Sequence, residues 1–299
     1  MKETFKETNF RPDSLALIAQ CDEVIEDYLG QGLRLTLRQL YYQLVTKNAI
    51  KNEERSYKNL SNLVSDARLS GILDWEAIED RIRVPRIPSE WSNIQELVDS
   101  ALYSYRLPRW KTQENYIELW VEKDALAGVL RPLAHQYHIP MMVNRGYSSQ
   151  SAMYEASKRF LDQQDKITLA ILYLGDFDPS GEDMVRDIED RMRIFGCADE
   201  FEVRKIALTL AQVKKYNPPP NPAKHSDPRS KEFIAKYGAS SWEVDAINPK
   251  ELSRIIKEEI KSYIDTDAME IILTKEEDDK QELTRAVQKI MKKTKGRPT

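Results

Sequence analysis

Hydrophobic side chains in the first third of the chain recur every three to four positions, the spacing of amphipathic helices. The two short helices in the middle of this stretch are joined by a brief polar turn, and Thr36 and Ser56 stand at their expected N-caps. Lys58 and Arg68 fall off the apolar face of the second, which is typical of a helix-turn-helix that contacts DNA. The pattern predicts helices at 13–29, 37–47, 57–70 and 89–105, with an extended wing at 81–86.

The pattern changes after residue 115, where short apolar runs alternate with amphipathic segments. Strands are predicted at 116–121, 139–143, 167–174 and 201–208, with helices at 124–137, 149–161 and 182–195 between them. Alternation at this spacing predicts a parallel sheet with right-handed crossovers. A proline-rich loop at 217–222 ends the alternation, and further helices are predicted at 231–237, 249–264 and 274–293.

These patterns predict an α/β protein whose helical part comes first. We expect a helical, DNA-binding domain at 1–106 and a linker at 107–115. The α/β domain with its tail would follow at 116–264, and a C-terminal helix with a basic tail at 265–299.

Composition narrows the class of protein. The chain has 299 residues, 41% of them hydrophobic, which is enough for a sizeable core. Two cysteines exclude a disulfide framework and a cysteine zinc site. The polar first ten residues do not have the pattern of a secretory signal, and no apolar run approaches the roughly 18 residues of a membrane span. We expect a cytoplasmic protein, associated with the nucleoid if its source is prokaryotic, without a membrane partner.

The distribution of charge is more informative than its sum. The net charge of −4 excludes a uniformly basic coat and is weak support for tight, unaided binding to duplex DNA. Residues 34–70 nevertheless carry seven basic against three acidic side chains, a local +4, and residues 289–299 carry five basic and no acidic ones. Contacts with nucleic acid are therefore expected from particular regions.

Acidic residues follow two of the predicted strands. Glu122 follows the first strand, and Asp176 and Asp178 follow the third at a spacing of two. If these strands are neighbours, the three carboxylates converge beyond their carboxyl ends, where open parallel sheets bind ligands. Clustered carboxylates without histidine or cysteine suit Mg²⁺, with Mn²⁺ as the alternative. The competing interpretation is that these acids cap the helices that follow them.

The motifs around these acids resemble a Toprim domain, most closely that of the topoisomerase VI A subunit and the meiotic double-strand-break transesterase. The resemblance rests on Val121-Glu122-Lys123, on the turn Asn144-Arg145-Gly146-Tyr147, and on Asp176-Phe177-Asp178-Pro179-Ser180-Gly181. It implies that Glu122, Asp176 and Asp178 coordinate Mg²⁺, and it makes Lys123 and Arg145 candidates for contacts with DNA phosphates. The segment 242–246 resembles a tail segment of relatives. We interpret its Glu243 and Asp245 as packing residues, with membership of the site as the alternative.

The helical part carries a second motif of the same family, which places a winged helix before the Toprim domain. Its nucleophile pattern matches Thr36-Leu37-Arg38-Gln39-Leu40-Tyr41-Tyr42, so the resemblance implies Tyr42 as nucleophile. From the residues alone, Tyr42 stands one turn after Arg38, whose guanidinium can hold a phosphate and lower the phenol pKa from about 10. The alternative is a packed pair of tyrosines.

Together the two motifs imply an enzyme that cleaves double-stranded DNA in a Mg²⁺-dependent transesterification, as a homodimer in which each subunit cuts one strand. In the family, the tyrosine of one subunit works with the metal site of the other. The sequence contains no ATPase domain of the kind topoisomerase VI needs, so the chain would be either a short, stand-alone relative or one part of a complex with a separate ATPase subunit or other partner protein. Two alternatives stay open: a Toprim nuclease that uses water, with Tyr42 structural, and a non-catalytic module that binds DNA or recruits a partner.

Overall fold

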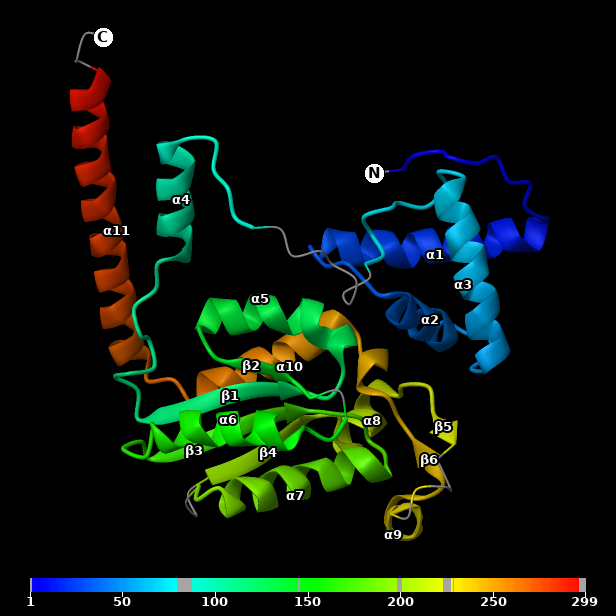
Figure 1. The fold of residues 1–299 in the computed structure, drawn as a ribbon. Helices are drawn as coiled ribbons and strands as arrows, with labels where there is room; N and C mark the ends of the chain where they lie inside the picture. Colours follow the sequence, from blue (N-terminus) through cyan, green and yellow to red (C-terminus); the bar gives the residue numbers. More distant parts are fainter. Residues whose placement is uncertain are drawn as a thin grey trace.

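The computed structural model describes residues 2–79, 88–144, 146–197, 201–222, 227 and 229–295, the last six of these by their backbone only. The predicted wing at 81–86 and Arg145 lie outside the described residues. Within them, the chain is an α/β protein with a four-stranded parallel sheet and many helices (Figure 1). The predicted fold class is confirmed at that level.

The first described part is built from three helices around one apolar core: α1 (Pro12–Gly30), α2 (Leu37–Thr46) and α3 (Glu54–Leu69). Thr36 caps α2 as predicted, because its side chain accepts from Gln39 N while the Gln39 side chain accepts from Thr36 N. The predicted cap of the next helix is wrong. The helix begins at Glu54, before Ser56, and Glu53 at the N-cap makes no side-chain capping bond.

The sheet consists of β1 (Asn115–Val121), β2 (Met141–Val143), β3 (Thr168–Leu174) and β4 (Phe201–Ala207), in the order β2-β1-β3-β4. All three pairings are parallel, as the alternation predicted. Helices α5 (Ala127–Tyr137) and α10 (Pro249–Ser262) cover one face, and α6 (Gln150–Leu161) and α7 (Pro179–Ile194) cover the other. Beyond their first residues, β1 and β3 are buried throughout, which explains the continuous apolar run of β3; in β1 one carboxylate, Glu118, is buried among the apolar residues.

The segment after the sheet folds back across the carboxyl ends of the strands. It contains α8 (Leu210–Tyr216), β5 (Asn221–Pro222), α9 (Ser230–Tyr237), β6 (Ser240–Ser241) and the 3₁₀ turn η2 (Val244–Ala246). A second 3₁₀ turn, η1 (Asp124–Leu126), follows β1. Phe177 and Trp242 form an isolated antiparallel bridge, with N···O distances of 2.8 and 3.0 Å. This bridge brings residues 242–246 to the end of β3.

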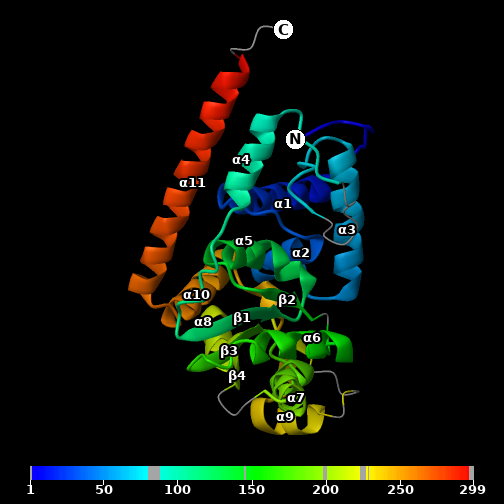
Figure 2. The same ribbon diagram turned by 60° about the vertical axis from the view of Figure 1, so that its left-hand side comes forward.

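Two helices stand away from the sheet: α4 (Ile94–Ser104) and the 30-residue α11 (Thr266–Lys295) run side by side (Figures 1 and 2). Helix α4 begins five residues later than predicted, capped by Asn93, and none of its residues is buried. Part of the predicted linker at 107–115 packs into the core, since Trp110 and Gln113 are buried. Within the described part of the chain, every helix is too short or too polar to cross a bilayer.

Candidate active site

The neighbouring strands β1 and β3 bring Glu122 and Asp176 together, as the sequence predicted. Val121 and Leu174 are paired in the sheet, and the next residues leave it at the same edge. Glu122 Oε2 accepts a hydrogen bond of 3.0 Å from Asp176 N. Gly175 makes this approach possible, because a Cβ there would lie 2.9 Å from Glu122 Oε2 and 2.6 Å from the Tyr173 ring.

Asp178 has the capping role that was the competing interpretation of the acidic motif. It is the N-cap of α7, and its Oδ1 accepts from Gly181 N at 2.6 Å and from Ser180 Oγ at 2.9 Å. Gly181 allows the first turn to pack closely, since a Cβ there would lie 2.2 Å from Asp176 O. The cap leaves Asp178 on the wall of the cavity described below.

The three carboxylates that converge most closely are not the predicted three. Among the described residues, Asp176, Glu243 and Asp245 each place a carboxylate oxygen within 4.8 Å of the others. Glu122 and Asp178 are outside that group. The bridge between Phe177 and Trp242 places both Glu243 and Asp245 beside Asp176, which favours membership of the site over the packing role expected for them. Asp176 Oδ1 also accepts from Val244 N at 2.9 Å, which fixes the two segments together.

Two basic side chains lie against this acidic group. Lys123 Nζ is 2.5 Å from Asp176 Oδ2 and 3.8 Å from Asp245 Oδ1, and it donates to Glu243 Oε2. Arg38 reaches across from α2, with its guanidinium 2.6 Å from Glu243 Oε2 and 3.4 Å from Asp245 Oδ2. Burial would lower the pKa of Lys123, but the three carboxylates outweigh it and raise that pKa. Lys123, a predicted DNA contact, thus lies inside the cluster.

The acidic group retains capacity for a further cation. Burial, opposed in part by Lys123, raises the pKa of Asp176 to about 7, and Glu122 and Glu243 add to the rise. Burial likewise raises the pKa of Asp245, which is 1% exposed and whose two oxygens have no hydrogen-bond partner. Its ion-pair contacts are long, at 3.4 and 3.8 Å. This buried acidic group can bind a metal ion, and its all-oxygen donor set suits Mg²⁺ or Mn²⁺.

Tyr42 comes to the same place from the other side. Arg38 donates to Tyr42 Oη at 3.4 Å, and the Tyr42 ring packs edge-on against Tyr41 at 5.2 Å between centroids. Tyr42 is only 5% exposed. Arg38 does act to lower the pKa of Tyr42, as expected, but its effect is the smaller one. Burial and Glu243 raise the pKa above 10.0, so the expectation of a lowered pKa was wrong.

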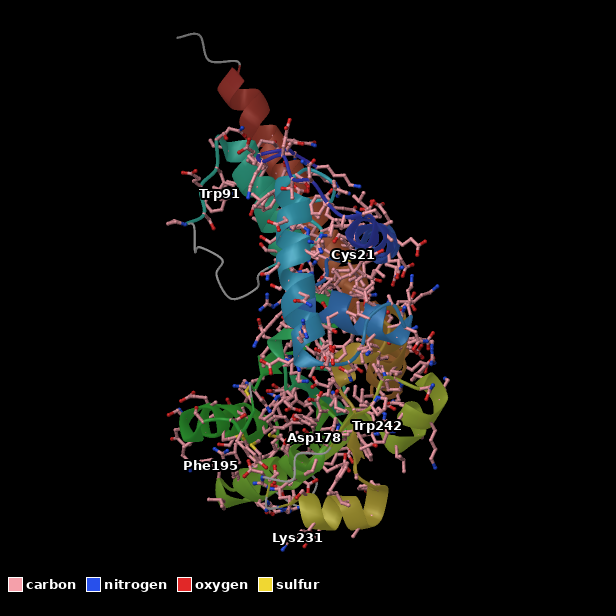
Figure 3. All side chains as sticks on the ribbon, turned by 90° about the vertical axis from the view of Figure 1, so that its right-hand side faces the viewer. Cys21, Trp91, Asp178, Phe195, Lys231 and Trp242 are labelled. Atoms are coloured by element: carbon pink, nitrogen blue, oxygen red, sulfur yellow. The ribbon has the colours of Figure 1, made fainter. Side chains whose placement is uncertain are left out.

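One cavity of about 590 Å³ joins these groups between α2, α3 and the ends of the strands. Figure 3 shows Asp178 and Trp242 on the side of the α/β part that faces α2 and α3. Five of the residues predicted for catalysis and metal binding line it: Arg38, Tyr42, Glu122, Asp176 and Asp178. Lys123, Glu243, three polar side chains (Asn52, Asn221 and Ser241) and the rings of Tyr41 and Tyr57 complete much of the wall.

The other predicted DNA contacts lie elsewhere. Lys58 is exposed on α3 and pairs with Glu54 at 2.7 Å, so it is open to a partner. Arg68 points inward: it donates to Trp75 O at 2.6 Å and to Ile78 O at 3.3 Å, and its guanidinium lies over the Trp75 ring. Its position indicates a structural role in holding the segment after α3.

No model of a protein family matches the chain, and no curated protein matches it significantly.

Proposed function

We propose that the chain is a metal-dependent DNA-cleaving transesterase, with a winged-helix part that carries Tyr42 and a Toprim-type part that carries the acidic group. The observation that carries the proposal is the position of Arg38. This side chain contacts Tyr42 Oη on one side and Glu243 and Asp245 on the other, and Arg38, Tyr42 and Glu243 line one cavity. A candidate nucleophile, a phosphate-binding guanidinium and a candidate metal centre are thereby adjacent.

Asp176, Glu243 and Asp245 would hold the metal, Mg²⁺ or Mn²⁺. When bound, the metal supplies Lewis-acid stabilisation of charge on the scissile phosphate. Lys123 shares the same carboxylate oxygens, so a metal would compete with its ammonium for them. A Lys123 released from these contacts has the charge and length to contact a DNA phosphate, the role the motif implied.

The charge of the cavity supports a strict need for this metal. Its wall carries six carboxylates against the two cations Arg38 and Lys123: Glu53, Glu54, Glu122, Asp176, Asp178 and Glu243. A DNA phosphate would be repelled by such a wall. Burial and this negative charge keep the Tyr42 phenol protonated, because burial first and Glu243 second raise its pKa. Added positive charge in the acidic group favours both phosphate entry and the phenolate.

The proposed reaction exchanges one phosphoester bond for another. The Tyr42 Oη proton leaves to water, and Oη forms a bond to the scissile phosphorus. The bond from phosphorus to the 3′ oxygen breaks, and that oxygen takes up a proton and leaves as a 3′-hydroxyl. Arg38 holds the phosphate beside Tyr42 Oη, and the phosphotyrosyl bond conserves the bond energy for resealing.

Hydrolytic cleavage is the second candidate, and one observation favours it. Tyr42 is buried, packs on Tyr41, and has a raised pKa, which are properties of a structural tyrosine. A water in the cavity would then attack the phosphate in place of the phenol, leaving DNA free of protein.

A covalent-trapping assay distinguishes the two. Purified protein is incubated with end-labelled duplex DNA and Mg²⁺ or Mn²⁺, then denatured, beside Tyr42→Phe and the matched control Tyr41→Phe. Label on protein in the wild type and the control, and none in Tyr42→Phe, establishes the transesterase. Free cut DNA in all three proteins establishes the nuclease. No cutting by any of them, also after candidate ATPase or other partner proteins are added, favours a non-catalytic module.

A further inference from the structure

The arm formed by α4 and α11 is a prebuilt projection. Helix α11 has 30 residues and is therefore about 45 Å long, and its C-terminal part stands clear of the sheet (Figures 1 and 2). Its base is fixed: Arg109 donates to both oxygens of the buried Glu276 at 2.7 and 2.8 Å, and Tyr105 Oη donates to Asp279 at 2.7 Å. A surface on this arm is thus presented in a defined direction.

The rest of the chain covers only part of the apolar surface of helix α4. Val98, Leu102 and Tyr105 are half-buried, whereas Ile94 is 70% and Leu97 44% exposed. An isolated helix of 11 residues is marginal in water, and none of the residues of α4 is buried. Helix α11 adds Leu273 and Leu283, each 40% exposed. The arm therefore carries apolar surface that a further partner would cover.

The charge pattern of α11 indicates which partner. Residues 266–279 carry six acidic side chains and one basic, a net −5. Residues 280–295 carry six basic side chains and one acidic, a net +5. The helix dipole favours this polarity only within the first and last turns, so it does not account for the charges in the middle of the helix.

A second copy of this chain is a complementary partner, because it carries the same acidic half and the same basic half on its own α11. In an antiparallel pair of α11 helices, the acidic half of each copy lies along the basic half of the other, and two-fold symmetry makes both contacts equivalent. A parallel pair would place like charges together. The change of charge near residue 280 sets the symmetry axis, and Leu283 lies within one turn of it.

We propose that the arm is a self-association surface, on which the α11 helices of two copies pack antiparallel and α4 of each copy packs beside one half of that pair. The contact between Tyr105 and Asp279 sets the level of the two helices, so Leu97 stands at about the level of residue 287. The exposed Ile94 and Leu97 of α4 thus stand at the levels of the second half of α11, which also carries Leu283. This association holds whether or not the chain cleaves DNA.

Charge reversal tests the proposal in the full chain by sedimentation equilibrium. One variant reverses the basic half by Lys289→Glu, Lys292→Glu and Lys293→Glu, and the other reverses the acidic half by Glu270→Lys, Glu277→Lys and Asp278→Lys. We expect a wild-type dimer, self-association of each variant weakened about 100-fold, and a dimer restored in their 1:1 mixture. The control Lys214→Glu, Lys231→Glu and Lys257→Glu, on exposed sites away from the arm, should remain dimeric.

The results that overturn the proposal are equally definite. A monomeric wild type would do so, and so would variants that dimerise alone or a mixture that does not. If the wild type is monomeric and the basic-half variant loses DNA affinity, the arm is a nucleic-acid contact instead.

Cross-linking tests the antiparallel arrangement. The native Cys21 and Cys197 are both buried, so introduced thiols report on the arm. Leu283→Cys should be joined between copies by a bifunctional thiol reagent that spans about 10 Å, because the two positions lie about 6 residues, roughly 9 Å, apart along the helix pair. Lys289→Cys should not be joined by this reagent, since its symmetry mate is about 18 residues further along the helix pair, roughly 27 Å away. Efficient cross-linking by Lys289→Cys would overturn the antiparallel arrangement.

Discussion

Two buried carboxylates of the α/β part differ in how fully their oxygens are hydrogen-bonded. Glu118, in the middle of β1, is fully buried and accepts four hydrogen bonds of 2.7–2.8 Å, from Tyr116, Trp120 and twice from Arg159. Asp245 is 1% exposed and accepts no side-chain hydrogen bond, with ion-pair contacts only at 3.4 and 3.8 Å. The first carboxylate is satisfied by its own chain, and the second is not.

We infer that the difference separates a structural charge from one that remains available to a ligand. A buried carboxylate with filled hydrogen-bonding capacity contributes to the fold and has no need of a ligand. A buried carboxylate beside Asp176 and Glu243, with unfilled capacity, is stabilised by whatever positive charge enters the cavity. The predictions below separate these two behaviours, starting with the largest expected effect.

Asp176→Asn should abolish DNA cleavage, with a loss of at least about 10³-fold. The amide keeps the shape of the side chain and an acceptor for Val244 N, so the fold should persist. It removes one of the three carboxylates that converge within 4.8 Å. The measurement is the single-turnover rate in saturating Mg²⁺, with circular dichroism as the check on folding. A rate within tenfold of the wild type would exclude Asp176 from the metal centre.

Mixing two inactive variants tests whether a single chain supplies the whole site. Tyr42 and Asp176 line the same cavity of one chain, so we propose that they act together in that chain. A mixture of Tyr42→Phe with Asp176→Asn should then stay inactive after subunit exchange. The family resemblance implies the opposite, because a tyrosine that works with the partner's metal site would restore nicking in one strand. Recovery of nicked DNA would establish that shared arrangement.

The sequence predicted the elements that depend on local pattern. The continuous apolar run of β3 reflects burial on both faces, and the alternation of strand and helix was enough to predict parallel pairing. The amphipathic pattern of α4 predicted a helix with an apolar face but not what covers that face. Periodicity identifies which side chains avoid water, whereas their partner is a tertiary property.

The site was predicted less completely, for a physical reason. Glu122 and Asp176 follow neighbouring strands, so parallel topology alone predicts their approach. Glu243 and Asp245 come more than sixty residues later, and their position depends on the bridge between Phe177 and Trp242. The signal that the sequence offered was the spacing of two between Glu243 and Asp245, which is also the spacing between Asp176 and Asp178. The pKa of Tyr42 was misjudged because its burial is not visible in the sequence.

Matched amide substitutions compare the two carboxylates as contributors to stability. Glu118→Gln should lower the free energy of unfolding by about 2–3 kcal/mol, because the amide turns a donor towards the donors that Glu118 now accepts from. The value stays modest since Arg159 is 40% exposed and can be rehydrated. Asp245→Asn should change stability by less than about 1 kcal/mol, because the lost ion pairs are offset by relief of repulsion from Asp176 and Glu243.

Chemical denaturation of the two variants beside the wild type measures this difference. Equal losses from Glu118→Gln and Asp245→Asn would show that Asp245 is as much a structural charge as Glu118. The comparison between the two carboxylates would then fail.

Divalent metal should stabilise the wild type by a small amount that depends on the acidic group. At ten times its dissociation constant, Mg²⁺ adds about 1.4 kcal/mol to the free energy of unfolding, which raises the melting temperature of a chain of this length by about 2 °C. Asp245→Asn should lose most of that shift, because one of the three candidate ligands is gone. Glu118→Gln should keep it, from a lower starting temperature, because its carboxylate is already bonded within the sheet. Thermal scans with and without Mg²⁺, with Na⁺ at matched ionic strength as control, measure the shift. A Mg²⁺ shift equal in all three proteins would place the metal away from Asp245, since a ligand stabilises a fold only through the contacts it makes with it.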